Sequence, residues 1–137
     1  MIFGQFVSDE EGLSKIEGLR EEIFGYKNCD LTGLSEIKYL LLLEDGIPVG
    51  ETVVAYKDLR LTITEIGVKE ERRFEHYGDF MVRMIADLAI YLHVRYIYSH
   101  VTEDSLDFFL SEHFEEVEGD LYRLDPESLR CACSRNK

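Results

Sequence analysis

The segment from residue 69 to 78 brings together residues that suit the binding of phosphate. Arg72 and Arg73 supply two positive charges, and Gly78 stands at the start of a region with a helical pattern. Backbone N–H groups at a helix start lack partners within the helix, and the helix dipole adds partial positive charge there. Phosphates bind such places, and a glycine lets a ligand approach the backbone closely. The alternative is an ordinary strand-to-helix turn in which Gly78 serves packing.

Other arrangements of catalytic or metal-binding residues are absent from the sequence. It has no HExxH pair, no Ser-His-Asp order and no Walker-type loop. The cysteines, Cys29, Cys131 and Cys133, are an odd number in a chain without an export signal, so we expect no disulfide. A metal site at the Cys-x-Cys pair would need two further ligands at suitable spacing. We therefore expect no bound metal, and we interpret residues 127–137 as a poorly ordered tail.

Apolar periodicity predicts the elements that would hold the phosphate-binding segment in place. Strands are expected at 2–7, 37–43, 49–56, 61–68, 94–101, 114–117 and 121–124. Helices are expected from Ser8 or Asp9 to Gly25, over 78–93, and briefly after Thr102. The unit from 61 to 101 should form a right-handed parallel crossover, and the other strand pairs look antiparallel. The sequence thus predicts one α/β domain over 1–126, with a mixed, mostly antiparallel sheet and helices on both faces.

Composition and charge narrow the classes of function. Apolar residues make up 45% and charged residues 31% of the 137 residues, an ordinary globular mixture without a run long enough to span a membrane. No signal-peptide pattern is present, so we expect a cytoplasmic protein. The net charge of -13 argues against nucleic acid and anionic membranes as partners. It would attract a cationic small molecule, or it would only keep the protein soluble.

The order of elements resembles the GNAT N-acetyltransferase superfamily over nearly the whole chain, and two local patterns add to the likeness. GNAT enzymes join the fourth strand to the next helix through Q/R-x-x-G-x-G/A. Arg73 falls on the first position and Gly78 on the last, while His76 stands where the first Gly is usual. The segment 106–114 resembles the family ending F-Y-x-x-x-G-F, with Phe109 at the Tyr and His113 at the Gly.

The resemblance implies where acetyl-CoA would bind. In the family the two central parallel strands, here 61–68 and 94–101, separate at one end and hold the thioester between them. The backbone near Ile66 and Val68 would pair with the pantetheine arm. The pyrophosphate would lie at the helix start, and Phe109 would border the cofactor. The residues expected at that helix start are Arg73, Phe74, His76, Tyr77, Gly78 and Asp79.

The resemblance also implies roles in acyl transfer, for which this chain offers several candidates. A base for the ammonium proton could be Glu65, His100 or Glu103, each with a structural role as the alternative. Family members commonly use the Tyr of the second motif as the acid for the thiolate, and Phe109 cannot donate a proton. Tyr98 is a substitute, unless it is only a half-buried aromatic residue of its strand.

The function implied is an acetyl-CoA-dependent N-acetyltransferase that acts on a primary amine of a small molecule or peptide by direct attack. The alternatives are a GNAT-like module that binds acyl-CoA without turnover, favoured by Phe109 and His76, and an unrelated interaction domain. We expect a cationic acceptor, because Glu21, Glu22, Asp30 and Glu36 surround the first helix and its following loop. A homodimer is left open.

Overall fold

The computed structural model describes residues 1–26, 36–73 and 75–129. The three cysteines and all but the first three residues of the expected tail lie outside this part. The strands are β1 (Ile2–Val7), β2 (Glu36–Glu44), β3 (Ile47–Lys57), β4 (Arg60–Val68), β5 (Ile97–His100), β6 (Glu115–Glu118) and β7 (Leu121–Leu124). The helices are α1 (Glu10–Phe24), α2 (Tyr77–Tyr91) and α3 (Leu106–Ser111), with 3-10 segments η1 (Glu70–Arg72) and η2 (Glu103–Ser105).

The strands form one mixed sheet in the order β1-β2-β3-β4-β5-β7-β6. Only β4 and β5 are parallel among the described strand pairs, and α2 makes the crossover between them. The predicted α/β fold, with its mostly antiparallel sheet and its β-α-β crossover, is confirmed. The predicted strand at 94–101 is shorter than expected, because Val94 N–H still bonds to Ala89 O after α2 and the strand begins only at Ile97.

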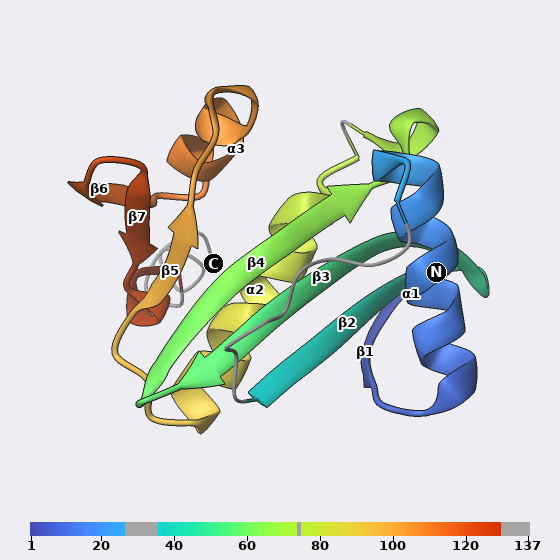
Figure 1. The fold of residues 1–137 in the computed structure, drawn as a ribbon, viewed down its shortest axis with the longest axis horizontal. Coiled ribbons are helices and arrows are strands. Elements are labelled where there is room, and N and C mark those ends of the chain that lie inside the picture. The colour runs from blue at the N-terminus through green and yellow to red at the C-terminus, as the bar shows by residue number, and fades with distance from the viewer. Residues whose placement is uncertain (27–35, 74, 130–137) are drawn as a thin grey trace.

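Helices cover both faces of the sheet, as predicted (Figure 1). Helix α2 packs on one face over the larger apolar core, which includes Leu61, Met81 and Ile85. Helix α1 covers the other face over a smaller cluster. The Asp9 side chain caps α1 by accepting from Gly12 N–H at 3.0 Å. The division matters for function because the α1 side of the sheet also carries the buried charged residues Arg20, Glu51 and Glu65.

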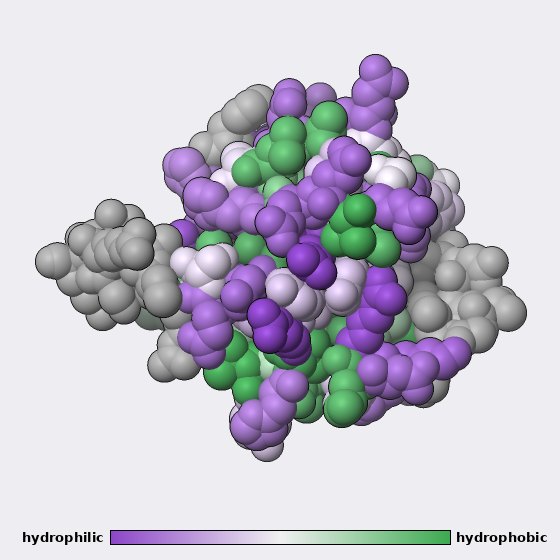
Figure 2. All heavy atoms as spheres, turned by 90° about the vertical axis from the view of Figure 1, so that its left-hand side faces the viewer, coloured by the Kyte–Doolittle hydropathy of each residue, from purple (hydrophilic) through white to green (hydrophobic). Residues whose placement is uncertain are grey.

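The side of the molecule formed by β5, β6 and β7 mixes hydrophilic and apolar side chains (Figure 2). Its outer strand, β6, exposes the glutamates Glu115, Glu116 and Glu118 to solvent. Charged side chains on an edge strand discourage pairing with another chain. No helix among the described residues is long and apolar enough to cross a bilayer.

Candidate functional site

Strands β4 and β5 pair only at their beginnings. Residues Leu61–Ile63 lie in parallel register with Ile97–Ser99, and Ser99 Oγ donates to Ile63 O at 3.4 Å. Beyond Ile63, β4 continues to Val68 with no described strand on its β5 side. Figure 1 shows the two strands diverging toward the end of the sheet that α3 borders. This divergence leaves one edge of the second half of β4 without a neighbouring strand.

A β-bulge in β4 lies at the point of divergence. Val54 of β3 is opposite Ile63 and Val53 is opposite Glu65, so Thr64 has no counterpart in β3. The Thr64 hydroxyl donates to Val53 O at 3.1 Å. A bulge bends its strand and increases the local twist. The bulge therefore accounts for the change in direction that carries the end of β4 away from β5.

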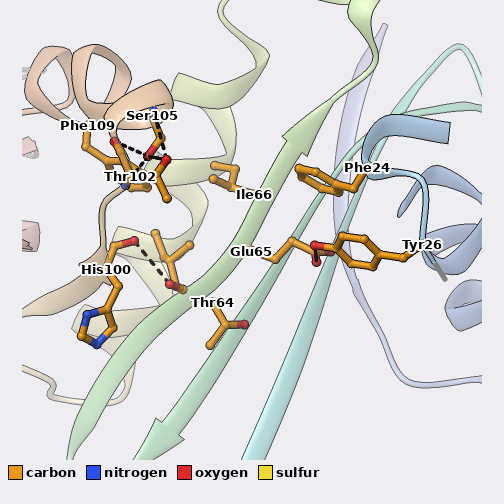
Figure 3. Close-up of a pocket in the computed structure, with 11 residues that line it drawn as sticks. Phe24, Tyr26, Thr64, Glu65, Ile66, His100, Thr102, Ser105 and Phe109 are labelled. Carbon is orange, nitrogen blue, oxygen red and sulfur yellow. Dashed lines mark hydrogen bonds between the residues drawn. The ribbon is translucent and has the colours of Figure 1, made fainter. Parts of the chain in front are cut away.

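A cavity of about 200 Å³ occupies the space between the diverging strands. One wall is β4 from Ile63 to Ile66, a second is formed by Thr102, Ser105 and Phe109, and a third by Phe24 and Tyr26 (Figure 3). The rings of Phe24 and Tyr26 are stacked with centroids 5.7 Å apart, and both are partly exposed. The cavity can therefore admit a small ligand from the side of α1.

Glu65 forms a buried ionic cluster on the α1 side of the cavity. Its Oε1 accepts from Arg20 Nε at 2.7 Å, and its Oε2 accepts from the Tyr26 hydroxyl at 3.1 Å. A second carboxyl group, that of Glu51 on β3, is fully buried beside it. Burial and the nearby Glu65 raise the pKa of Glu51 to about 9, although Arg20 acts in the opposite direction. Glu51 is thus protonated at neutral pH.

The wall formed by α3 has an aromatic ring where the family motif has a Tyr. Phe109 is buried, with its ring centroid 4.9 Å from that of Phe114. One turn earlier in the sequence, Thr102 Oγ1 and Ser105 Oγ lie 3.0 Å apart in a capping box. Both residues line the cavity with Phe109. The wall is therefore not without proton donors.

The start of α2 is open to a ligand. His76 is its N-cap residue and makes no side-chain capping hydrogen bond, and His76 has φ 63°. The motif position that is usually Gly thus has the left-handed conformation that glycine favours. Arg73 Nε donates to Val68 O at 3.3 Å, so its guanidinium lies by the end of β4. Phe74, which was also expected at this helix start, lies outside the described residues.

The next residues of α2 combine packing with exposed backbone. Tyr77 is buried, and its hydroxyl donates to Glu44 Oε2. A Cβ added at Gly78 would lie 2.7 Å from Phe108 Cε1, so this glycine also allows α3 to pack closely. The sequence left a phosphate site and a packing role as alternatives for Gly78, and the packing contact is present.

A third buried carboxyl group lies near the start of α2. Glu112, at the end of α3, is 6% exposed. Burial and hydrogen bonding to Asp79 raise the pKa of Glu112 to about 8. Asp79 in turn accepts from Arg83 Nε at 3.0 Å. The cluster therefore ties α3 to the first turns of α2.

Comparisons with known proteins give matches in structure but none in sequence. No family model and no curated protein matches the chain. The structure of PaiA N-acetyltransferase from Thermoplasma acidophilum, in complex with coenzyme A, superposes with a TM-score of 0.71 at 11% identity, over 90% of this chain and 96% of that one. Tetrahymena GCN5 gives 0.72 at 10% identity, over 90% and 95%. The chain has the GNAT fold.

Further structures of the same fold come from proteins with other acceptors in their names. An aminoglycoside acetyltransferase from an uncultured soil metagenomic sample gives a TM-score of 0.69 at 15% identity, over 86% of this chain and 92% of that one. At such identities the likeness concerns the fold. The GNAT fold recognised from the order of elements and two incomplete motifs is therefore confirmed, while the roles of individual residues depend on the geometry of this chain.

Within the GNAT fold, the remaining three sequence candidates direct no functional group into the cavity. Glu103 is exposed and does not line the cavity, whereas His100 does. The His100 imidazole points away from it (Figure 3), and its Nδ1 lies 3.0 Å from Asp120 Oδ1 with both side chains 67% exposed. Tyr98 does not line the cavity, and its ring lies under the guanidinium of Arg60 at 3.7 Å. Among the candidate bases and acids, only Glu65 brings its functional group to the cavity wall.

Several residues of the candidate site were missed from the sequence. Tyr26, Thr102 and Ser105 line the cavity, and Arg20 and Glu51 lie in the buried cluster around Glu65. The charge of Arg20 on an otherwise apolar stripe was the one available signal. The others are ordinary residues in their elements, and only the fold brings them together.

Proposed function

We propose that the protein is an acetyl-CoA-dependent N-acetyltransferase that acts on a primary amine of a small molecule or peptide. One observation carries the proposal: the free edge of β4 runs from the cavity toward the uncapped start of α2. A thioester in the cavity and a pyrophosphate at the helix would be joined by an arm along that edge. The coenzyme A complex of the PaiA structure supports this arrangement.

The residues present fit such a ligand. The N–H groups of Tyr77, Gly78 and Asp79 are in the first turn of α2, where no helical partner exists and phosphate oxygens can accept. The Arg73 guanidinium adds a positive charge near the end of β4. Backbone groups near Ile66 and Val68 are placed to pair with the pantetheine amides. Phe109 gives the thioester end an apolar wall.

Bound acetyl-CoA would supply an acetyl thioester that the amine attacks directly. The stacked rings of Phe24 and Tyr26 would hold the acceptor at the cavity mouth. Glu65 is the carboxylate nearest that mouth and would orient the nitrogen and receive its proton, directly or through water. The hydroxyl of Ser105 or Thr102 would donate to the leaving thiolate in place of the missing Tyr hydroxyl. The side chains of this protein would then both orient the reactants and transfer the protons.

A module that binds acyl-CoA without turnover is the second candidate. Phe109 favours it, because the phenyl ring places no proton donor in the wall of the cavity that α3 forms. The hydroxyls of Thr102 and Ser105 also bond to each other, which reduces their readiness to donate elsewhere. Both candidates predict binding, and only the first predicts release of free thiol.

Binding is tested by the melting temperature with coenzyme A. At about 100 times the dissociation constant, a ligand that binds only the folded state adds about 2.7 kcal/mol of stability. Arg73→Ala should weaken binding and reduce the rise, whereas Arg60→Ala, which alters a surface arginine stacked on Tyr98, should leave it intact. No rise with millimolar coenzyme A would refute both candidates.

Turnover is tested by thiol release from acetyl-CoA in the presence of a panel of amines. Amine-dependent release with formation of the acetylated amine establishes the transferase. A clear melting shift without release from any amine class, including peptide N-termini, would favour the binding module.

A further inference from the structure

We propose that Glu51 and Glu65 share a single proton beneath α1, and that Glu51, as its holder, is a positioning residue that keeps Glu65 oriented toward Tyr26 and the cavity. The role of the pair in acyl transfer rests on the function proposed above. The shared proton itself does not depend on that function. No motif singles out Glu51, which occupies an ordinary inward-facing position in β3.

The two carboxyl groups are brought together by the register of the sheet. Glu51 is opposite Gly67, and Val53 is opposite Glu65, so Glu51 and Glu65 are diagonal neighbours on the α1 face. Diagonal neighbours in antiparallel strands are within reach of long side chains. A Cβ added at Gly67 would lie 3.3 Å from Glu51 Oε1 and 2.9 Å from the Phe24 ring. Gly67 therefore leaves the space in which the Glu51 carboxyl group lies across β4.

The balance of charge requires a proton in this cluster. Arg20 is the cation that contacts it, at 2.7 Å from Glu65, and both side chains of that ion pair are 5% exposed. Two buried carboxylates beside one guanidinium would leave a net negative charge out of water, which is strongly unfavourable. One carboxyl group must therefore stay protonated, as in other pairs of acids that share a site.

The hydrogen bonds decide which group holds the proton. Both oxygens of Glu65 accept from donors, one from Arg20 Nε and one from the Tyr26 hydroxyl. If Glu51 is treated as a carboxylate that can only accept hydrogen bonds, neither of its oxygens has a partner, and its side chain is fully buried. A protonated Glu51 becomes a donor, with Glu65 as the acceptor beside it. The proton thus satisfies Glu51 and adds a further bond that fixes Glu65.

Among the described groups around Glu51, none supplies a second compensating charge. Leu41 is opposite it on β2, and Tyr39 lies two residues further along the same face. Past the end of α1, Tyr26 contributes a hydroxyl donor to Glu65 rather than a cation. Lys69 lies by the end of β4, but it pairs with Glu22 at 3.5 Å. Arg20 thus has to balance the pair alone among the described neighbours.

The first test is a pH titration of the side-chain carboxyl carbons of glutamate by NMR, with Glu51 assigned from the signal missing in Glu51→Gln. Glu51 is expected to stay protonated through neutral pH, with a pKa of about 9. In Glu65→Gln the neighbouring carboxylate is lost while Glu51 stays buried, so the pKa of Glu51 should fall from its value in the unmodified protein. An ordinary acidic titration of Glu51 in the unmodified protein, or an unchanged titration of Glu51 in Glu65→Gln, would overturn the proposal.

The second test separates positioning from packing. Glutamine has the shape of protonated glutamate and donates a hydrogen bond, so Glu51→Gln should keep the Tyr26 ring signals unchanged at pH 7. Between pH 7 and 9, below the ordinary ionisation range of a tyrosine, those signals should shift in the unmodified protein as Glu51 loses its proton, but not in Glu51→Gln. Glu17→Gln, the same change at an exposed site of α1, should behave like the unmodified protein throughout. Identical alkaline behaviour of the Glu51→Gln variant and the unmodified protein would contradict the positioning role.

The activity assay adds a third readout. Glu51→Ala should raise the KM for the acceptor amine about tenfold, while the melting shift with coenzyme A persists. Glu51→Gln should rescue the KM at pH 7 and extend activity to higher pH. If no amine is acetylated at all, the transferase proposal fails, and the NMR results still decide whether the pair shares a proton.

Discussion

At the scale of single residues, three histidines adopt the left-handed backbone conformation that glycine usually adopts. His76, His93 and His113 have φ values of 63°, 60° and 72°, and each stands at the end of a helix. His is among the residues that tolerate positive φ better than most. This explains how the two family motifs keep their backbone geometry after losing a glycine. Each of these histidines therefore carries backbone strain from its positive φ.

Replacing His76 with glycine should therefore stabilise the protein. The left-handed conformation costs about 1 to 2 kcal/mol for an ordinary residue, and the added freedom of glycine in the unfolded chain returns about 0.5 to 1 kcal/mol of that. We expect a net gain of about 0.5 kcal/mol in urea denaturation. His113→Gly is the matched control and should give a similar gain without changing the affinity for coenzyme A. A loss of stability in both variants would show that their side chains contribute contacts that outweigh the strain.

A single hydroxyl should matter at position 109. Phe109 lines the cavity and stands where the family motif has Tyr. Phe109→Tyr would place a proton donor in this wall, and general acid catalysis contributes about a hundredfold or more where it operates. We expect thiol release to rise at least tenfold in steady-state assays. Phe114→Tyr, at a neighbouring buried ring, should give no such rise. An unchanged rate in Phe109→Tyr would mean that Ser105 or Thr102 already serves, or that proton donation does not limit the rate.

At the scale of elements, the contact between α2 and α3 depends on the absence of a side chain at Gly78. Gly78→Ala would put a Cβ 2.7 Å from Phe108 Cε1 and 3.0 Å from Cζ. Overpacking of this kind costs about 1 to 3 kcal/mol. Chemical denaturation should show that loss in Gly78→Ala and a smaller loss when the same change is made in a Phe108→Leu background. Equal losses in the two backgrounds would mean that the ring moves freely.

At the scale of the whole molecule, buried acids link stability to pH. Glu112 has a pKa of about 8 in the folded state, against 4.5 when it is unperturbed. The folded state thus binds more protons than the unfolded state between these values, and stability must fall as the pH rises through this window. Urea denaturation from pH 5 to 9 should show the decline. Glu112→Gln should make it shallower, whereas the exposed Glu118→Gln should not. A stability that rises with pH over this range would contradict the assignment.

The net charge of -13 makes a prediction about the acceptor. An acidic surface attracts a protonated amine, so a cationic acceptor should show a KM that rises with ionic strength. The structure weakens part of the reasoning, because Glu22 pairs with Lys69 and Glu36 with Lys38, both at 3.5 Å, while Asp30 lies outside the described residues. The net negative charge of the whole chain still favours cations. The measurement is a comparison of turnover with spermidine and lysine analogues against turnover with glutamate analogues. Faster turnover of the anionic amine would rule out a preference for cationic acceptors.

The sequence by itself determined the order of elements, the parallel crossover and the place of the strand-to-helix turn that contains Arg73 and Gly78. These follow from local patterns: apolar periodicity, Asp-Gly and Gly turns, and the length of the connection between residues 61 and 101. Such features are set by residues close together in the chain. The same locality explains why strand ends were missed, since hydrogen bonds after α2 delay the start of β5 to Ile97.

Only the tertiary structure decided which side chains meet at the cavity and in the buried cluster beside it. Arg20, Glu51 and Glu65 come from a helix and two strands, and their meeting depends on sheet register and on the bulge at Thr64. His100 and Tyr98 are on the right strand, yet the imidazole points away from the cavity and the Tyr98 ring does not line it, because side chains alternate between the faces of a strand. Proton affinity depends on burial and on neighbours distant in sequence. Neither the burial of a side chain nor its neighbours in space can be read from the amino-acid sequence alone.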